Sequence, residues 1–154
     1  LDAYLASTFL RARREGKPLA FALVDVDFFK GYNDAYGHQR GDQALIEVAN
    51  AMRTQVSREG DLVARYGGEE MAIVLPDLSA EQALAMAEQV REAVQRLGIE
   101  HRQSAYDQIT VSVGVVAGVP GVDFSDAEAM VAAADQALYA AKGGGRNRVV
   151  LAAL

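Results

Sequence analysis

The sequence predicts one mixed α/β domain built on a ferredoxin-like βαββαβ core. Apolar runs of strand length alternate with amphipathic stretches of helix length, and two of the strand-like runs are joined by a short glycine turn. With 154 residues, of which 51% are hydrophobic, the chain is long enough for one core. We therefore expect a mainly antiparallel central sheet flanked by helices.

An amphipathic helix and a buried strand open the chain. Residues 1–15 repeat apolar side chains at helical spacing, and Gly16 follows where the pattern stops. Residues 19–26 are an uninterrupted apolar run, which predicts a central strand covered on both faces. The run ends in Asp25 and Asp27, and carboxylates at such a strand end are costly unless they are paired or bind a metal.

A polar loop, a helix and a hairpin follow. Residues 28–38 are expected to be a loop with at most a short helical turn, and Gly41 opens the helix, with Asp42 a candidate for its N-terminal cap. The expected apolar face of this helix comprises Leu45, Ile46, Ala49 and Met52. Within residues 61–76, two strand-like runs separated by a glycine-containing segment predict a β-hairpin.

Two capping signals predict the remaining helices. Ser79 and Gln82 fit a capping box ahead of a helix over residues 80–97. Residues 125–128 fit a second box, with Ser125 as the cap, and its helix runs to a glycine-rich break at 142–147.

Two further strands are expected in the second half. Residues 109–117 alternate and are rich in β-branched side chains, and residues 149–151 form a short last strand. The intervening residues 99–108 are polar, and His101 among them is expected to be exposed.

Composition narrows the classes of function. A net charge of −6 and the absence of a Lys/Arg-rich run argue against a nucleic-acid partner. The chain has no cysteine, which excludes disulfides and thiolate metal sites. It contains no signal peptide and begins with Leu, so we expect residues 1–154 to be a single domain of a longer protein.

The hairpin turn holds two glycines and then two carboxylates, Gly67, Gly68, Glu69 and Glu70. Glycine lets a ligand approach the main chain, whereas neighbouring carboxylates repel each other unless a cation is present. If the hairpin lies beside the first strand, Asp25 meets these acids at one edge. Carboxylates with a backbone carbonyl suit Mg²⁺, and two such ions can clamp an in-line phosphoryl displacement. A solvated hairpin tip is the alternative.

Basic and amide side chains offer contacts to a nucleotide. Lys30, Lys142 and Arg146 are candidate phosphate contacts, and the alternatives are a solvated lysine and favourable charges at a helix C-terminus. Asn33 and Asp42 carry the groups that recognise guanine, because a carboxylate accepts from its ring N–H and exocyclic amine. Adenine offers no matching pair of donors.

Other polar residues are weaker candidates. His38 is expected to be a structural hydrogen-bonding residue rather than a general base. Arg58 and Asp61 are three residues apart; a surface salt bridge is the default interpretation, and a clamp on a guanine edge and a phosphate is the alternative.

Short motifs run through nearly the whole chain. They are Asp25-Val26-Asp27-Phe28-Phe29-Lys30, Asn33-Asp34, Gly37-His38, Gly41-Asp42, Arg65-Tyr66-Gly67-Gly68-Glu69-Glu70, Ala134-Asp135, Ala137-Leu138-Tyr139, Ala141-Lys142 and Gly145-Arg146-Asn147. In this order they resemble a GGDEF domain, the diguanylate cyclase family. The resemblance implies a palm-type fold similar to nucleotidyl cyclase catalytic domains. It also implies condensation of two GTP into cyclic di-GMP with release of two pyrophosphates.

The resemblance implies roles for the acidic residues. Asp25 and Glu69 would bind the metal together with the carbonyl of Val26, and Glu70 would be a further ligand or help to activate the 3′-hydroxyl. Catalysis would then rest on Asp25, Glu69 and Glu70 with two Mg²⁺ or Mn²⁺ ions at each site.

The resemblance also implies a set of substrate-binding residues. They are Phe28, Phe29, Lys30, Asn33, His38, Asp42, Leu45, Gly67, Gly68, Lys142 and Arg146. Backbone N–H groups of the two phenylalanines and the three cationic side chains would contact phosphates. Asn33 and Asp42 would hold guanine with Leu45 packed on it, and the glycines would leave room for the nucleotide.

Partners and regulation follow from the same resemblance. A homodimer would join two GTP molecules, and an upstream sensor or regulatory domain would control it. Arg58 and Asp61 would form an inhibitory site for cyclic di-GMP, with Arg91 as a possible second basic residue. The domain would be cytoplasmic, in a protein that upstream segments could anchor to a membrane. The alternative is a non-catalytic sensor of GTP or cyclic di-GMP. Met71 departs from the family, which usually has Phe there.

Overall fold

A five-stranded sheet forms the centre of the computed structural model, which describes residues 1–154. The strands are β1 (Leu19–Val26), β2 (Leu62–Gly67), β3 (Glu70–Pro76), β4 (Val111–Gly118) and β5 (Val149–Leu151). Their order in the sheet is β2-β3-β1-β4-β5. β1 pairs antiparallel with both β3 and β4, and only β5 is parallel to its neighbour. The predicted ferredoxin-like, mainly antiparallel core is confirmed.

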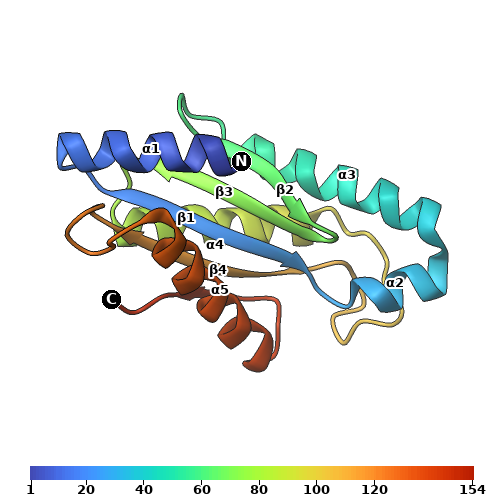
Figure 1. The fold of residues 1–154 in the computed structure, drawn as a ribbon. Helices are drawn as coiled ribbons and strands as arrows, with labels where there is room; N and C mark the ends of the chain where they lie inside the picture. Colours follow the sequence, from blue (N-terminus) through green and yellow to red (C-terminus); the bar gives the residue numbers. More distant parts are fainter.

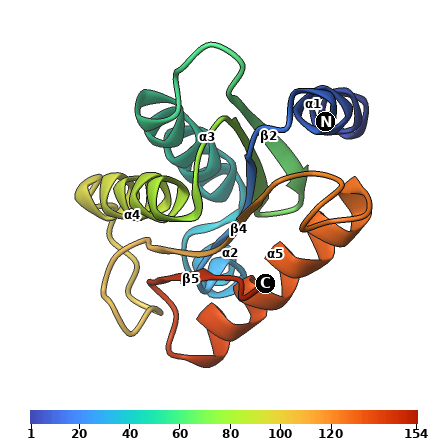
Figure 2. The ribbon, with the colours of Figure 1, turned by 90° about the vertical axis from the view of Figure 1, so that its left-hand side faces the viewer.

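Helices cover both faces of the sheet. They are α1 (Asp2–Glu15), α2 (Phe29–Tyr36), α3 (His38–Gln55), α4 (Ala80–Arg96) and α5 (Ala127–Gly143). The view along the sheet in Figure 2 shows α3 and α4 on one side and α1 and α5 on the other. Every residue of β1 is buried, because its alternating side chains enter both apolar layers. This explains the uninterrupted apolar run.

Several local predictions are confirmed. Gly16 ends α1 in the left-handed conformation at φ 64°, which glycine adopts without strain. Ser79 and Gln82 form the reciprocal capping box of α4. β2 and β3 form the predicted hairpin. None of the helices combines the length and the apolarity that a membrane span needs.

The segment after β1 differs from the prediction. Residues 28–38 contain the eight-residue helix α2 rather than a loop, and α3 begins at His38 rather than at Gly41. Gly37, at φ 90° and ψ 159°, makes the corner that allows one helix to follow the other directly. Asp42 therefore lies inside α3 and does not cap it. Ile46 is 54% exposed, because Ala44 and Val48 form the buried face with Ala49 and Met52.

Two predictions in the second half are wrong. Asp126, not Ser125, caps α5, and its side chain accepts a hydrogen bond from the Ala129 N–H. His101 is fully buried rather than exposed. Its loop folds back on itself through a bond from the His101 N–H to the Asp107 carbonyl, which turns the ring inward.

Three separate parts of the chain meet at one end of the sheet. Figure 1 shows the carboxyl end of β1, the tip of the β2–β3 hairpin and α2 at the same end of the molecule. The carboxyl-terminal end of α5 joins them, since Lys142 in its last turn contacts Asp25. Antiparallel pairing of β1 with β3 is what places the hairpin turn beside the strand end.

Candidate active site

The backbone holds the acidic turn against the end of β1. Asp25 lies opposite Glu70 in the register of β1 and β3. One residue further, the Val26 N–H donates a hydrogen bond of 3.3 Å to the Glu69 carbonyl. The prediction that Asp25 meets Glu69 or Glu70 at one edge is therefore confirmed.

A hollow of about 190 Å³ opens at this edge. Its lining consists of Asp25, Val26, Asp27, Phe28, Phe29, Lys30, Glu69, Lys142 and Arg146. These residues come from the end of β1, the start of α2, the hairpin turn, the last turn of α5 and the segment after it. The structure thus gathers the predicted metal ligands and the predicted phosphate contacts around one space.

The acids of this hollow favour a cation beside them. Burial raises the pKa of Asp25, and the charges of Glu69 and Asp27 raise it further, whereas contact with the Lys142 ammonium lowers it. Burial and the charge of Asp25 raise the pKa of Glu70 as well. Crowded, partly desolvated carboxyls resist ionisation, and a bound cation would relieve both effects.

Basic side chains line the same hollow as the acids. The Lys142 ammonium makes an ion pair with Asp25. The Arg146 guanidinium lies over the Phe28 ring at 4.8 Å from its centroid. Lys30 is exposed and makes no ion pair. The hollow therefore combines cationic groups with carboxylates.

The glycine turn leaves its surroundings open. A Cβ built on Gly67 or on Gly68 would have no heavy atom within 4 Å. Gly68 has φ +53°, and its carbonyl accepts a 2.9 Å hydrogen bond from Arg65 Nε, which closes the turn. Open space on the outer side of a rigid turn is what the close approach of a large ligand requires.

The predicted metal ligands fit Mg²⁺ by their chemistry. No group of three His, Cys, Asp or Glu side chains gathers as a metal cage. Asp25, Glu69 and the Val26 carbonyl instead offer a small set of hard oxygen donors at the hollow. Mg²⁺ suits such a set because it keeps water and substrate phosphates as its other ligands. The ammonium of Lys142 at Asp25 shows that positive charge is accommodated there.

A second hollow, of about 370 Å³, lies between α3 and the hairpin. Its walls include Asp42, Leu45, Arg65 and Met71, so two of the predicted guanine contacts share it. Asn33 on α2 is packed so closely over Gly41 that a Cβ there would overlap its side-chain oxygen. That oxygen is buried and has no hydrogen-bond partner. Such an unpaired group is costly unless a ligand supplies the partner.

Comparisons with known proteins agree with this geometry. The sequence profile of the family described as diguanylate cyclase, GGDEF domain, matches residues 1–148. The chain belongs to the GGDEF domain family.

Two relatives show how much of a longer protein such a domain represents. Diguanylate cyclase A of Treponema denticola is 42% identical over 135 residues, which is 86% of this chain and 35% of that protein. The response regulator PleD of Caulobacter vibrioides is 39% identical over 152 residues, 97% of this chain and 33% of that protein. The GGDEF domain thus spans about a third of the length of these relatives.

Solved structures share the fold over nearly the whole chain. The GGDEF domain of DgcB from Caulobacter crescentus, in complex with cyclic di-GMP, superposes with a TM-score of 0.87 at 36% identity. That match covers 97% of this chain and 86% of the other. The active GGEEF domain of a Vibrio cholerae diguanylate cyclase has a TM-score of 0.85 at 35% identity, covering 99% and 94%. The letters GGEEF in the name of that domain stand for two glycines followed by two adjacent glutamates, the same order as Gly67, Gly68, Glu69 and Glu70 here.

Three other predicted residues of this GGDEF domain, Arg58, Asp61 and His38, lie outside the two hollows. Arg58 and Asp61 form an ion pair of 2.7 Å, as the salt-bridge interpretation expects, and Arg58 also donates to the Pro76 carbonyl at 2.9 Å. The Asp61 side chain is only 1% exposed. His38 is exposed and makes no hydrogen bond, so the structure gives it no structural bonding role. Met71 is buried and packs in the core.

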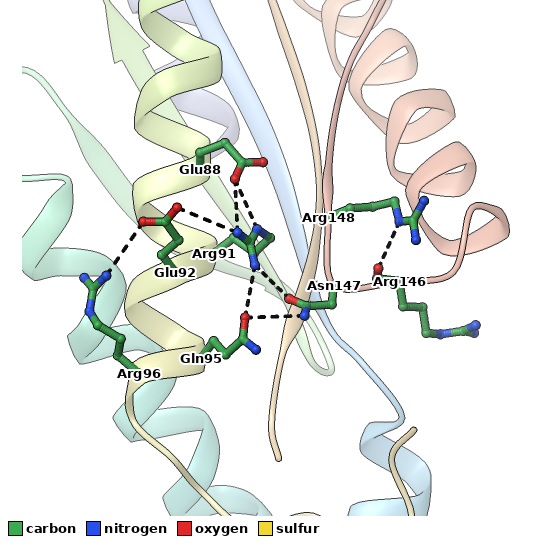
Figure 3. Close-up of polar contacts among 8 residues, drawn as sticks. All are labelled: Glu88, Arg91, Glu92, Gln95, Arg96, Arg146, Asn147 and Arg148. Atoms are coloured by element: carbon green, nitrogen blue, oxygen red, sulfur yellow. Dashed lines mark hydrogen bonds and ion pairs between the residues drawn. The ribbon is translucent and has the colours of Figure 1, made fainter. Parts of the chain in front are cut away.

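Arg91, on α4, is part of a polar network. Its guanidinium donates to Glu88 and Gln95 on its own helix and to Asn147 Oδ1 at 3.1 Å (Figure 3). It makes no contact with Arg58. The network ties α4 to the segment that carries Arg146.

Asp27 and His101 support the GGDEF site in ways that the sequence did not predict. Asp27 accepts hydrogen bonds from Thr110 Oγ1, Ser112 Oγ and the Asn147 N–H, at 2.7, 2.6 and 3.0 Å. His101 Nε2 is 2.8 Å from the Phe28 carbonyl. The alternating hydroxyls at 110 and 112 were a signal for a buried polar partner, whereas nothing in the sequence indicated the His101 contact.

Proposed function

We propose that this domain condenses two GTP molecules into cyclic di-GMP and releases two pyrophosphates. The observation that supports the proposal is the single hollow at the strand ends, where Asp25 and Glu69 face Lys142 and Arg146. Acids that bind a metal and cations that bind phosphates are both needed for nucleotidyl transfer. The family membership and the named cyclases among the relatives support it as well.

Two Mg²⁺ or Mn²⁺ ions at each site would be held by Asp25, Glu69 and the Val26 carbonyl. When bound, they would lower the charge repulsion at the α-phosphate and make the attacking hydroxyl more acidic. The raised pKa values of Asp25 and Glu70 fit this role, because a cation would stabilise their ionised forms.

The chain itself would position the nucleotide. Lys142, Arg146 and Lys30 would offset the charge of the phosphates, together with backbone N–H groups at the start of α2. Asp42 would accept from the guanine ring N–H and amine, and the unpaired Asn33 amide would complete the recognition. ATP would bind weakly, because adenine would not offer Asp42 a matching pair of donors.

The reaction needs two protomers that face each other. The 3′-oxygen of one GTP attacks the α-phosphorus of the other, the bond to the β-phosphate oxygen breaks, and pyrophosphate leaves. Glu70, with its raised pKa, would accept the hydroxyl proton. A second, symmetric transfer closes the ring.

Incubation of the protein with GTP and Mg²⁺, followed by chromatography, tests the proposal. We expect cyclic di-GMP from the wild type and none from Glu69→Gln or Asp25→Ala. Melting curves give an independent readout: Mg²⁺ raises the Tm of the wild type but not of Glu69→Gln. Full activity of either variant would refute the metal assignment. Nucleotide binding without turnover by the wild type would favour the sensor function instead.

Feedback inhibition through Arg58 and Asp61 is a further part of the proposal. Both groups are already engaged with each other, so cyclic di-GMP would have to compete with the bond between them. Calorimetry with cyclic di-GMP tests this: Arg58→Ala should lose product binding while GTP turnover remains. Equal binding by both proteins would place the inhibitory site elsewhere.

Upstream domains and location are also proposals. Because relatives are about three times longer than this chain, we propose that a sensor or regulatory domain of the full protein brings two GGDEF domains together. The domain would work in the cytoplasm, where GTP is available. One solved relative, the cyclase SiaD of Pseudomonas aeruginosa, is in complex with its activator SiaC.

A further inference from the structure

We propose that His101 is a positioning residue for the phosphate end of the site. It fixes the direction of the peptide unit between Phe28 and Phe29, and with it the first free N–H groups of α2. The inference rests on the proposed function, because it concerns how the same site holds a nucleotide. His101 lies in the loop between α4 and β4.

The hydrogen bond from His101 has only one possible direction. A carbonyl oxygen only accepts, so Nε2, at 2.8 Å from the Phe28 oxygen, carries the proton. Nδ1 is buried and has no partner. The ring is completely buried, and so this single bond is formed away from competing water.

Phe28 needs such a contact because its backbone is strained. Its φ of 54° lies in the left-handed region, which is unfavourable for a residue with a bulky side chain. It precedes α2 without any side-chain capping bond. Two donors converge on its carbonyl: the Tyr32 N–H at 3.0 Å, from the first turn of α2, and His101. Together they hold a conformation that the residue would not adopt by itself.

The consequence for the hollow follows from peptide geometry. The chain has no cis peptide bond, so the Phe29 N–H points away from the Phe28 carbonyl and hence away from His101. Phe28 and Phe29 both line the hollow. N–H groups in the first turn of a helix have no acceptor within it, and an anion placed there satisfies them.

His101 is itself held firmly enough to act as a support. Its N–H donates to the Asp107 carbonyl at 3.0 Å, and its carbonyl accepts from the Ser104 N–H at 3.1 Å. The ring stands edge-on to Tyr32, at 87° with centroids 5.2 Å apart. The loop between α4 and β4, which is remote in sequence, therefore packs against the start of α2 and supports it.

Two substitutions separate the hydrogen bond from the volume of the ring. His101→Phe keeps an aromatic ring beside Tyr32 but removes the donor. His101→Gln places an amide N–H at a reach similar to that of Nε2. The ligands are a GTP analogue with a methylene group between the α- and β-phosphates, added with Mg²⁺, and guanosine, which has no phosphate.

We expect His101→Phe to bind the analogue about tenfold more weakly than wild type, which corresponds to one well-oriented hydrogen bond to a charged group. Its affinity for guanosine should be unchanged, and His101→Gln should recover most of the analogue affinity. A loss of both ligands in equal measure, or a failure of His101→Gln to recover binding, would show a merely structural role and overturn the proposal.

A ligand-free measurement keeps the inference separate from the proposed function. In NMR spectra of the protein without nucleotide, the amide signals of Phe29 and Lys30 should shift in His101→Phe and return in His101→Gln. Unchanged signals in His101→Phe would refute the positioning role, whatever the protein catalyses. Absence of cyclic di-GMP synthesis by the wild type would refute the proposed function while leaving this shift to be observed.

Discussion

Glu70 is a residue whose charge is unfavourable in the metal-free fold. It lies opposite Asp25 in the sheet, and burial and that neighbour raise its pKa above the ordinary 4.5. A carboxyl whose pKa is higher in the folded than in the unfolded state binds more protons when folded. The free energy of unfolding therefore falls as the pH rises from 4.5 through the raised pKa.

We predict that Glu70→Gln melts at a higher temperature than wild type at neutral pH in EDTA, because it removes this penalty. The advantage should shrink as the pH falls through the raised pKa and vanish below 4.5, where the carboxyl is neutral in both states. Thermal melts over a pH series measure it. Glu47→Gln, on the exposed face of α3, serves as the control and should show no such trend.

Asp27 shows how a strand-end carboxylate becomes a structural centre. It is 3% exposed and accepts three hydrogen bonds, one of them from the N–H of Asn147. Arg146 and Asn147 both have left-handed backbones, at φ 67° and 45°, so this segment needs an anchor. The hydrogen bond from the Asn147 N–H to the Asp27 carboxylate anchors the segment and thereby positions the neighbouring Arg146.

We predict that Asp27→Ala lowers the free energy of unfolding by about 2–4 kcal/mol, because it leaves buried donors on Thr110 and Ser112 unpaired. Urea unfolding measures the change. Asp123→Ala is the matched control: its exposed carboxylate accepts one backbone bond, from Val119, and its removal should cost less than about 1 kcal/mol. Equal losses of unfolding free energy in the two variants would show that the hydrogen bonds of the buried Asp27 carboxylate do not contribute more than an exposed bond.

At the scale of elements, the close packing of α5 on β4 places Lys142 at the hollow. A Cβ on Gly114 of β4 would overlap backbone atoms of Leu138 and Ala134 in α5. Only glycine allows this approach. The helix then runs along the sheet and ends with Lys142 in contact with Asp25.

We predict that Gly114→Ala lowers stability by about 1–3 kcal/mol and weakens nucleotide binding, because α5 must move outward and takes Lys142 with it. Chemical denaturation and binding of the GTP analogue measure both effects. Gly143→Ala is the control: it lies on the same helix with open space around its Cβ position. A neutral Gly114→Ala would show that the sheet and the helix can separate without cost.

The elements also show where periodicity succeeds and where it fails. β1 was predicted because a strand buried on both faces is apolar throughout. α2 was missed because eight residues are too few to establish a helical period, and because Gly31 in their interior disfavours a helix. It is stabilised instead by aromatic packing, with the rings of Tyr32 and Tyr36 stacked at 4.6 Å. Both rings also stand edge-on to His101 of the α4–β4 loop, and a tertiary contact of this kind leaves no mark on local periodicity.

At the scale of the whole molecule, the hollow holds the groups for one nucleotide, whereas the proposed product contains two. We predict that the synthesis rate of this chain rises with the square of protein concentration at low concentration, since the proposed reaction needs two protomers. Initial rates over a wide dilution series measure it. A rate strictly proportional to protein throughout would indicate either a stable dimer, which sedimentation detects, or a monomeric reaction, which would contradict the prediction.

The sequence by itself determined the family, the order of all the elements except α2, and the acidic and cationic residues of the hollow. These features could be predicted because they depend on motifs and on the short-range periodicity of apolar residues, both of which can be recognised in the sequence. Asp25, Glu69 and Lys142 were therefore named correctly as residues that lie together.

Only the tertiary structure decided which groups support them. His101 is 73 positions from Phe28, and the Asn147 N–H is 120 positions from the Asp27 carboxylate that binds it. Such contacts depend on how the α4–β4 loop and the segment after α5 fold onto the sheet. Burial at these distances is a property of the packed chain, and no local pattern of residues records it.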